Sequence, residues 1–65
     1  MKALKNRLAL DDVSSYDVAQ WISRSNVYVV QKLKGVSPFT VWEMWTIADR
    51  LGIEPKDLRK FFPDS

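Results

Sequence analysis

A chain of 65 residues forms one domain with a thin stability margin, because a domain of this size buries only about 60% of its unfolded surface. The chain contains neither cysteine nor histidine, which excludes a disulfide framework and a Cys/His metal site. Its apolar segments are far shorter than the roughly 20 residues that cross a bilayer, and its N-terminus lacks the features of a signal peptide. We therefore expect a cytoplasmic protein without a metal or other cofactor.

The net charge of +2 is modest, but it is unevenly distributed. Residues 1–35 carry six basic and three acidic side chains, whereas residues 36–65 carry four and five. Between Arg24 and Lys34 there are three basic residues and no acidic residue. This distribution fits an N-terminal half that neutralises phosphates, although an ordinary solvated surface would give the same pattern.

Catalysis is not expected from this composition. A hydrolase or transferase needs a base, a nucleophile and a pocket, and the sequence offers no histidine, cysteine or glycine-rich phosphate loop. Asp11 and Asp12 are adjacent acids, but such a pair at a helix end is more typical of a solvated surface than of a catalytic or metal site.

The first two predicted helices cover residues 2–10 and 15–22. In the first, Leu4 and Leu8 lie one turn apart on the same face. In the second, Ser14 is placed to accept a hydrogen bond from an unpaired backbone N–H group at the N-terminus. The inward face of this second helix is formed by Val18, Ala19 and Ile22.

A third helix is predicted for residues 26–34, after a short turn. Ser25 or Asn26 can cap its start, and Gly35 follows its end, where a left-handed residue is favoured. Its apolar arc consists of Val29, Val30 and Leu33. The opposite arc consists of Arg24, Val27, Tyr28 and Gln31, with Lys32 and Lys34 on the flanks. Two helices joined by a short turn form the helix-turn-helix pattern, which also occurs in small helical domains that bind no DNA.

The C-terminal half predicts two more helices, over residues 41–51 and 55–62. Thr40 caps the fourth helix and Pro55 begins the fifth. The inward face predicted for the fourth helix consists of Val41, Met44, Trp45, Ala48 and Leu51, with Ile47 beside them. Trp42 falls about 140° from the centre of that face, so we expect it, with Phe39, to form a protein interface. The alternative is that Trp42 folds back onto Phe39 or a terminal segment.

Helical periodicity throughout and the absence of alternating strands predict an all-α fold of five helices around one core. The residues expected to be buried are Leu8, Ile22, Val30, Met44, Ala48, Leu51 and Leu58. Phe61 and Phe62 are expected to close this core, and residues 1–65 are expected to form a single domain.

These segments together resemble the five-helix DNA-binding domain of the phage repressor and Cro family, a compact lambda-repressor-like fold. The resemblance covers about residues 4–62, with the motif at about 14–35. It rests on VSSYDVAQWI, on the KG pair after the third helix, on TVWEMWTIADRLGI and on EPKDLRKFF. Two positions in the turn differ, since Ser23 and Arg24 stand where the family usually has glycine and an apolar residue. Lys32 also stands where an apolar residue is common.

The resemblance implies a transcriptional regulator that inserts its third helix into the major groove of double-stranded operator DNA, as a homodimer. It implies a phosphate contact by Ser15 and base contacts from the first turns of the third helix. By side-chain chemistry, Gln31 suits an adenine edge, Tyr28 suits a phosphate or a thymine methyl group, and the lysines suit phosphates. The full set of expected DNA contacts is Ser15, Arg24, Ser25, Asn26, Val27, Tyr28, Gln31, Lys32 and Lys34.

A second interpretation stays open at this point. An antirepressor or modulator could keep the same fold and bind another regulator protein through Tyr28, Trp42 and the neighbouring apolar surface. The modest net charge and the exposed aromatic residues favour this alternative.

Overall fold

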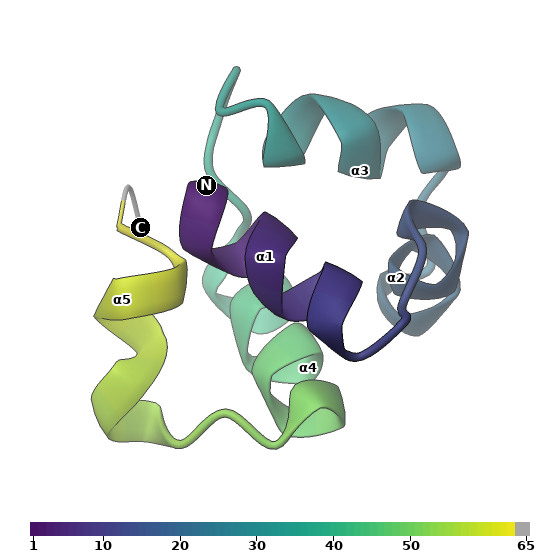
Figure 1. The fold of residues 1–65 in the computed structure, drawn as a ribbon. Helices are drawn as coiled ribbons and strands as arrows, with labels where there is room; N and C mark the ends of the chain where they lie inside the picture. Colours follow the sequence, from purple (N-terminus) through teal and green to yellow (C-terminus); the bar gives the residue numbers. More distant parts are fainter. Residues whose placement is uncertain (64–65) are drawn as a thin grey trace.

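The computed structural model describes residues 1–63, and no strand occurs in that part of the chain. Five α-helices follow one another: α1 (Lys2–Leu10), α2 (Ser15–Ile22), α3 (Asn26–Leu33), α4 (Val41–Leu51) and α5 (Leu58–Phe61). A single 3-10 turn, η1 (Pro55–Asp57), lies directly before α5 (Figure 1). The predicted all-α fold is confirmed.

Short polar side chains fix where three of these helices begin. The hydroxyl groups of Ser14, Ser25 and Thr40 accept hydrogen bonds from backbone N–H groups at the starts of α2, α3 and α4. In α2 and α4 the acidic residue at the third helical position bonds back to the cap backbone, which completes a capping box. The predicted N-termini of these helices are therefore confirmed, and Ser25 rather than Asn26 caps α3.

The C-terminal segment differs from the prediction of one continuous helix over residues 55–62. The backbone N–H of Asp57 donates to the carbonyl of Glu54, three residues earlier, at 2.9 Å, which gives the tighter 3-10 turn. The α-helical part then lasts only from Leu58 to Phe61. Likewise α3 ends at Leu33, and Lys34 is its C-terminal cap.

One apolar core joins all five helices. Its most deeply buried members come from different elements: Leu4 of α1, Val18 of α2, Val29 of α3, Ile47 of α4 and Phe62 after α5. Two residues predicted to be buried, Val30 and Leu58, are instead only partly buried, and Phe61 is also partly exposed. The other predicted core residues are confirmed as buried: Leu8, Ile22, Met44, Ala48 and Leu51.

The buried face of α4 is rotated from the predicted one. Val41 and Trp45 were expected inside but are 62% and 63% exposed. The inward residues are instead Glu43, Met44, Ile47, Ala48 and Leu51. The physical reason is that Glu43 finds partners on the inner side, because the hydroxyl group of Tyr28 and the Nε of Arg24 donate to its carboxylate there.

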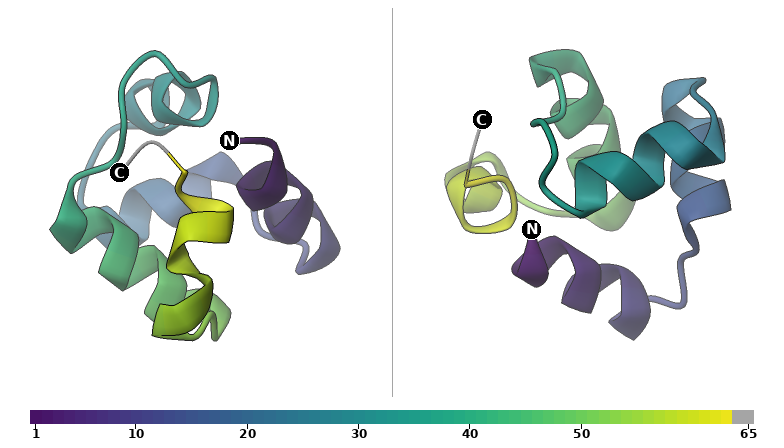
Figure 2. Two further views of the ribbon diagram at one scale, coloured as in Figure 1. Left: turned by 90° about the vertical axis from the view of Figure 1, so that its left-hand side faces the viewer. Right: turned by 90° about the horizontal axis from the view of Figure 1, so that it is seen from above.

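The arrangement leaves α3 at the edge of the molecule. α2 packs against both α3 and α4, and α1 packs against α5. In Figure 1 and in the side view of Figure 2, α3 runs along the top, and no other helix of residues 1–63 lies above it. One long side of α3 is therefore open to a partner. None of the described helices is both long and apolar enough to span a lipid bilayer.

Candidate nucleic-acid interface

The open side of α3 carries a continuous stripe of side chains. It consists of Val27, Val30, Gln31 and Lys34, which we call the α3 stripe. Their spacing of three, four and seven residues places them on one face of a helix. Val27 is 66% exposed, Gln31 and Lys34 are exposed, and Val30 is partly buried. This face combines two apolar surfaces, one amide and one cation.

Tyr28 lies on the flank of α3 and turns towards α4. Its hydroxyl group donates to the carboxylate of Glu43, at 2.7 Å from Oε2 and 3.0 Å from Oε1. This hydrogen bond raises the pKa of Tyr28, because a phenolate would stand beside another negative charge, and burial acts in the same direction. Tyr28 therefore links the two helices and is not directed outwards from α3.

Glu43 is a buried carboxylate with a full set of partners. It is 2% exposed, and the backbone N–H of Thr40 donates to its Oε1 at 2.9 Å. The Nε of Arg24 contacts its Oε2 at 3.3 Å and supplies a positive charge. Burial alone would raise the pKa of Glu43, but the hydrogen bonds from Thr40 and Tyr28 and the charge of Arg24 together lower it. Glu43 therefore stays ionised inside the domain.

Two cations lie close to the ring of Tyr28. The guanidinium carbon of Arg24 lies 5.0 Å from the ring centroid and the Nζ of Lys32 lies 4.8 Å from it. The same Nζ donates to Ser37 Oγ at 2.8 Å and to the carbonyl of Pro38 at 3.0 Å. Both cations are thus engaged in intramolecular contacts beside α3.

The N-terminal ends of α2 and α3 are tied together by polar side chains. The hydroxyl group of Ser15 donates to Oδ1 of Asn26, and the hydroxyl group of Ser25 accepts the backbone N–H of Tyr28 at 3.1 Å. Ser15 and Asn26 are both partly buried. The first contact joins the first residues of α2 and α3, and the second caps the start of α3.

The nine residues predicted to contact DNA fall into two groups. Intramolecular hydrogen bonds or ion pairs engage six of them: Ser15, Arg24, Ser25, Asn26, Tyr28 and Lys32. The other three, Val27, Gln31 and Lys34, face outwards on the α3 stripe. The sequence alone did not distinguish these groups, because contacts such as those of Arg24 and Tyr28 with Glu43 join residues that are distant in the chain.

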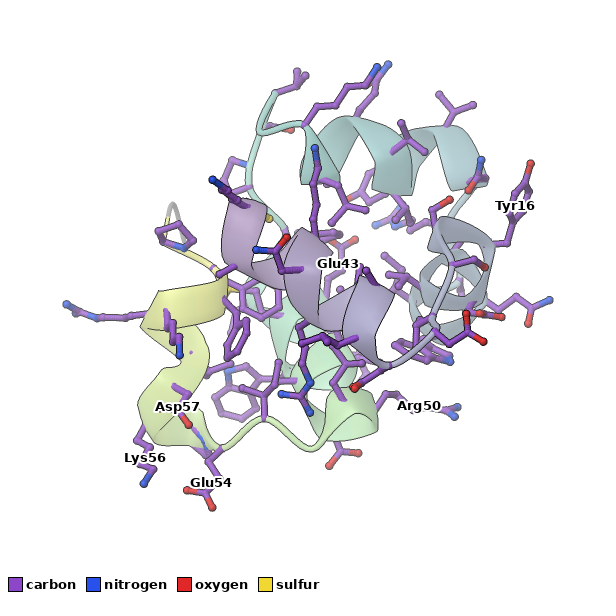
Figure 3. The ribbon with its side chains drawn as sticks, viewed as in Figure 1. Tyr16, Glu43, Arg50, Glu54, Lys56 and Asp57 are labelled. Carbon is purple, nitrogen blue, oxygen red and sulfur yellow. The ribbon has the colours of Figure 1, made fainter. Side chains whose placement is uncertain are left out.

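One exposed aromatic residue near this site was missed. Tyr16 is 68% exposed and follows Ser15 at the start of α2. In Figure 3 it projects from the edge of the molecule, whereas Glu43 lies among the side chains between the helices. A signal was present in the sequence, because Tyr16 precedes the inward residues of α2 and falls outside their apolar arc.

A second exposed surface lies on α4, and Phe39 does not belong to it. Trp42 and Trp45 are 76% and 63% exposed. They border a groove of about 490 Å³ whose other wall includes Ile53, Pro55 and Leu58. Phe39 is only 3% exposed and packs edge-on against Phe62, with centroids 6.0 Å apart. The prediction that Phe39 shares an interface with Trp42 is therefore wrong.

Comparisons of the chain with models of protein families, with curated proteins and with solved structures gave no match. The features of the molecule that bear on function are therefore the α3 stripe, the residues that contact Glu43, and the groove beside Trp42 and Trp45.

Proposed function

We propose that this chain is a small transcriptional regulator that binds operator DNA by placing α3 in the major groove. The observation that carries the proposal is the α3 stripe, an outward face on a helix that follows a short turn and packs across α2. A recognition helix in such a pair contacts base edges with its N-terminal residues. Val27 is the second residue of α3, Gln31 lies one turn further along the same face, and both are exposed.

The charges around α3 support the same proposal. Lys34 is exposed at the C-terminal end of the helix, where it suits a backbone phosphate. The side chain of Arg24 is 53% exposed, and only its Nε is directed to Glu43. Its outer nitrogens are therefore placed to donate to a second phosphate beside the turn.

The proposed assembly on DNA is a homodimer. A two-fold operator presents two half-sites about one helical turn apart, and a dimer places one α3 in each. The residues proposed to join the two copies are Trp42 and Trp45, because they are large, apolar and exposed on α4.

The salt dependence of binding to a random-sequence duplex tests DNA binding directly. For a protein that neutralises phosphates, the logarithm of the binding constant falls linearly as the logarithm of the salt concentration rises. The slope is about −0.9 for each phosphate contacted. Lys34→Ala should reduce that slope by about 1. Lys60→Ala removes the same charge from α5 and is the matched control, for which we expect an unchanged slope. Absence of binding at low salt would exclude the proposed function.

A second candidate function has its own supporting observation. The groove beside Trp42 and Trp45 has a volume typical of binding pockets and a mostly apolar lining. A modulator that binds another regulator protein would use this surface in place of α3. The random-duplex experiment separates the two, since the modulator has no need to bind DNA.

A further inference from the structure

We infer that α3 recognises A·T base pairs, with Val27 and Val30 against thymine methyl groups and Gln31 on the adenine edge. This inference rests on the proposed function and specifies the class of DNA sequence that the site would prefer. It follows from which side chains the structure leaves free to face the groove.

The residues that could read guanine are held elsewhere. Arginine and lysine are the usual partners of guanine O6 and N7 in the major groove. Arg24 is directed by its Nε to Glu43, and Lys32 donates to Ser37 and Pro38. Both also pack on the ring of Tyr28, away from the α3 stripe. Neither cation extends along the stripe.

Lys34 is exposed but stands at the wrong end of the helix to read bases. In this binding mode the N-terminal residues of the recognition helix contact base edges. Lys34 is the C-terminal cap of α3, seven residues after Val27. It is therefore positioned for a phosphate and not for guanine. Cytosine lacks its common partner as well, because acidic side chains usually accept from its amino group and the sequence has none from Arg24 to Trp42.

The remaining side chains match adenine and thymine. Thymine alone among the four bases carries a methyl group in the major groove, and an apolar side chain is its natural contact. Val27, 66% exposed, and Val30 present methyl groups one turn apart on the stripe. Gln31 is exposed beside them, and a carboxamide can bond adenine N6 and N7 together.

Three synthetic duplexes test the inference: alternating poly(dA-dT), poly(dA-dU) and poly(dG-dC). Uracil lacks only the methyl group of thymine, so the first pair isolates the effect of that group. From dA-dT to dA-dU we expect affinity to fall about fourfold for each thymine methyl group that packs on a valine. From dA-dT to dG-dC we expect a fall of about 5- to 150-fold, as when a bidentate pairing with a base is removed.

Two variants assign the contacts to residues. Val27→Ala should reduce the difference between dA-dT and dA-dU by about fourfold, the share of one valine, whereas Val36→Ala should leave the difference intact. Val36 is the matched control because it is 70% exposed and lies outside α3. Gln31→Ala should reduce the preference for dA-dT over dG-dC. Circular dichroism melting of each variant verifies that it folds.

The outcomes separate this inference from the proposed function. Equal binding of all three duplexes would overturn the inference and leave DNA binding in place. A preference for dA-dT that survives both Val27→Ala and Gln31→Ala would also overturn it, because the sequence would then be read by other residues or by DNA shape. Binding to none of the three at low salt would overturn the proposed function and the inference together.

Discussion

The hydroxyl group of Tyr28 donates to the carboxylate of Glu43, 2.7 Å away, and this contact joins α3 to α4. Glu43 accepts from the backbone of Thr40 and pairs with Arg24 at the same time. One buried acid thereby connects the turn before α3, the flank of α3 and the start of α4.

Tyr28→Phe should destabilise the domain by about 1.5–3 kcal/mol, because it removes a hydrogen bond to a charged acceptor. Urea denaturation measures the change. Tyr16→Phe removes the same atom from a residue that is 68% exposed, and it should change stability by less than about 0.5 kcal/mol. Equal effects of the two variants would show that the bond to Glu43 contributes little.

Stability should fall in acid because of Glu43. Its pKa in the folded chain lies below the ordinary value of 4.5, whereas the unfolded chain titrates near that value. As the pH falls below about 4.5, the unfolded state binds the proton first, so unfolding becomes more favourable. The stabilisation is therefore present above this pH and is lost as the pH drops through the folded pKa. Denaturation curves at several pH values measure the free energy of unfolding. This free energy should fall less in acid for Glu43→Gln than for the wild type, and an equal fall in both would contradict the prediction.

The starts of α2, α3 and α4 and the end of α4 were predictable from the sequence because they depend on local signals. Ser14, Ser25 and Thr40 each precede a periodic apolar segment, and Gly52 ends α4 in the left-handed conformation with a φ of 72°. The face of α4 was not predictable in the same way. The apolar periodicity admits Val41 and Trp45 on the inner face, and only the partners of Glu43 from α3 and the preceding turn decide against it.

Leu51→Ala and Val41→Ala together test the corrected face of α4. Leu51 is 7% exposed, so its truncation should cost about 2–5 kcal/mol and leave a cavity. Val41 is 62% exposed, and its truncation should cost less than about 0.5 kcal/mol. Thermal melting measures both. A large loss for Val41→Ala would mean that the face predicted from periodicity is the buried one.

Ser23→Gly should stabilise the domain. Ser23 ends α2 with φ 57° and ψ 44°, a left-handed conformation that costs a non-glycine residue about 1–2 kcal/mol. Part of the gain is offset by the greater freedom of glycine in the unfolded chain, which leaves roughly 0.5–1 kcal/mol. Ser25→Ala, two residues later, should instead destabilise by about 0.5–2 kcal/mol because it removes the cap of α3. A lower melting temperature for Ser23→Gly would contradict the strain at this position.

The candidate site was predictable as a region but not as a set of free side chains. The resemblance to the phage repressor and Cro family indicated Ser15, and together with helix spacing it indicated the residues of α3 and of the turn before it. Tyr28 and Lys32 looked available, since an isolated helix shows only which face a residue occupies. The structure adds the long-range partners, Glu43 for Tyr28 and Pro38 for Lys32, and these decide which groups remain for a ligand.

The chain that covers the exposed indole of Trp42 differs between the two candidate functions: a second copy in the regulator and another protein in the modulator. Trp42 is 76% exposed, and burying it against a second chain would remove apolar surface from water at about 25 cal/mol per Å². Two exposed indoles supply about half of the roughly 800 Å² that each partner buries in a standard interface. We therefore expect a weak dimer that forms at high protein concentration or on DNA.

Trp42→Glu is the decisive change, with Leu10→Glu as its control because Leu10 is 82% exposed at the end of α1. For the regulator, Trp42→Glu should lower the solution mass to that of a monomer and weaken binding to a duplex with two half-sites by about tenfold or more, as for an interface hot spot. Leu10→Glu should change neither quantity. Sedimentation over a range of protein concentrations and duplex titration provide the measurements. A wild type that stays monomeric and binds no duplex would exclude the dimeric regulator and favour the modulator, whose partner would then cover Trp42.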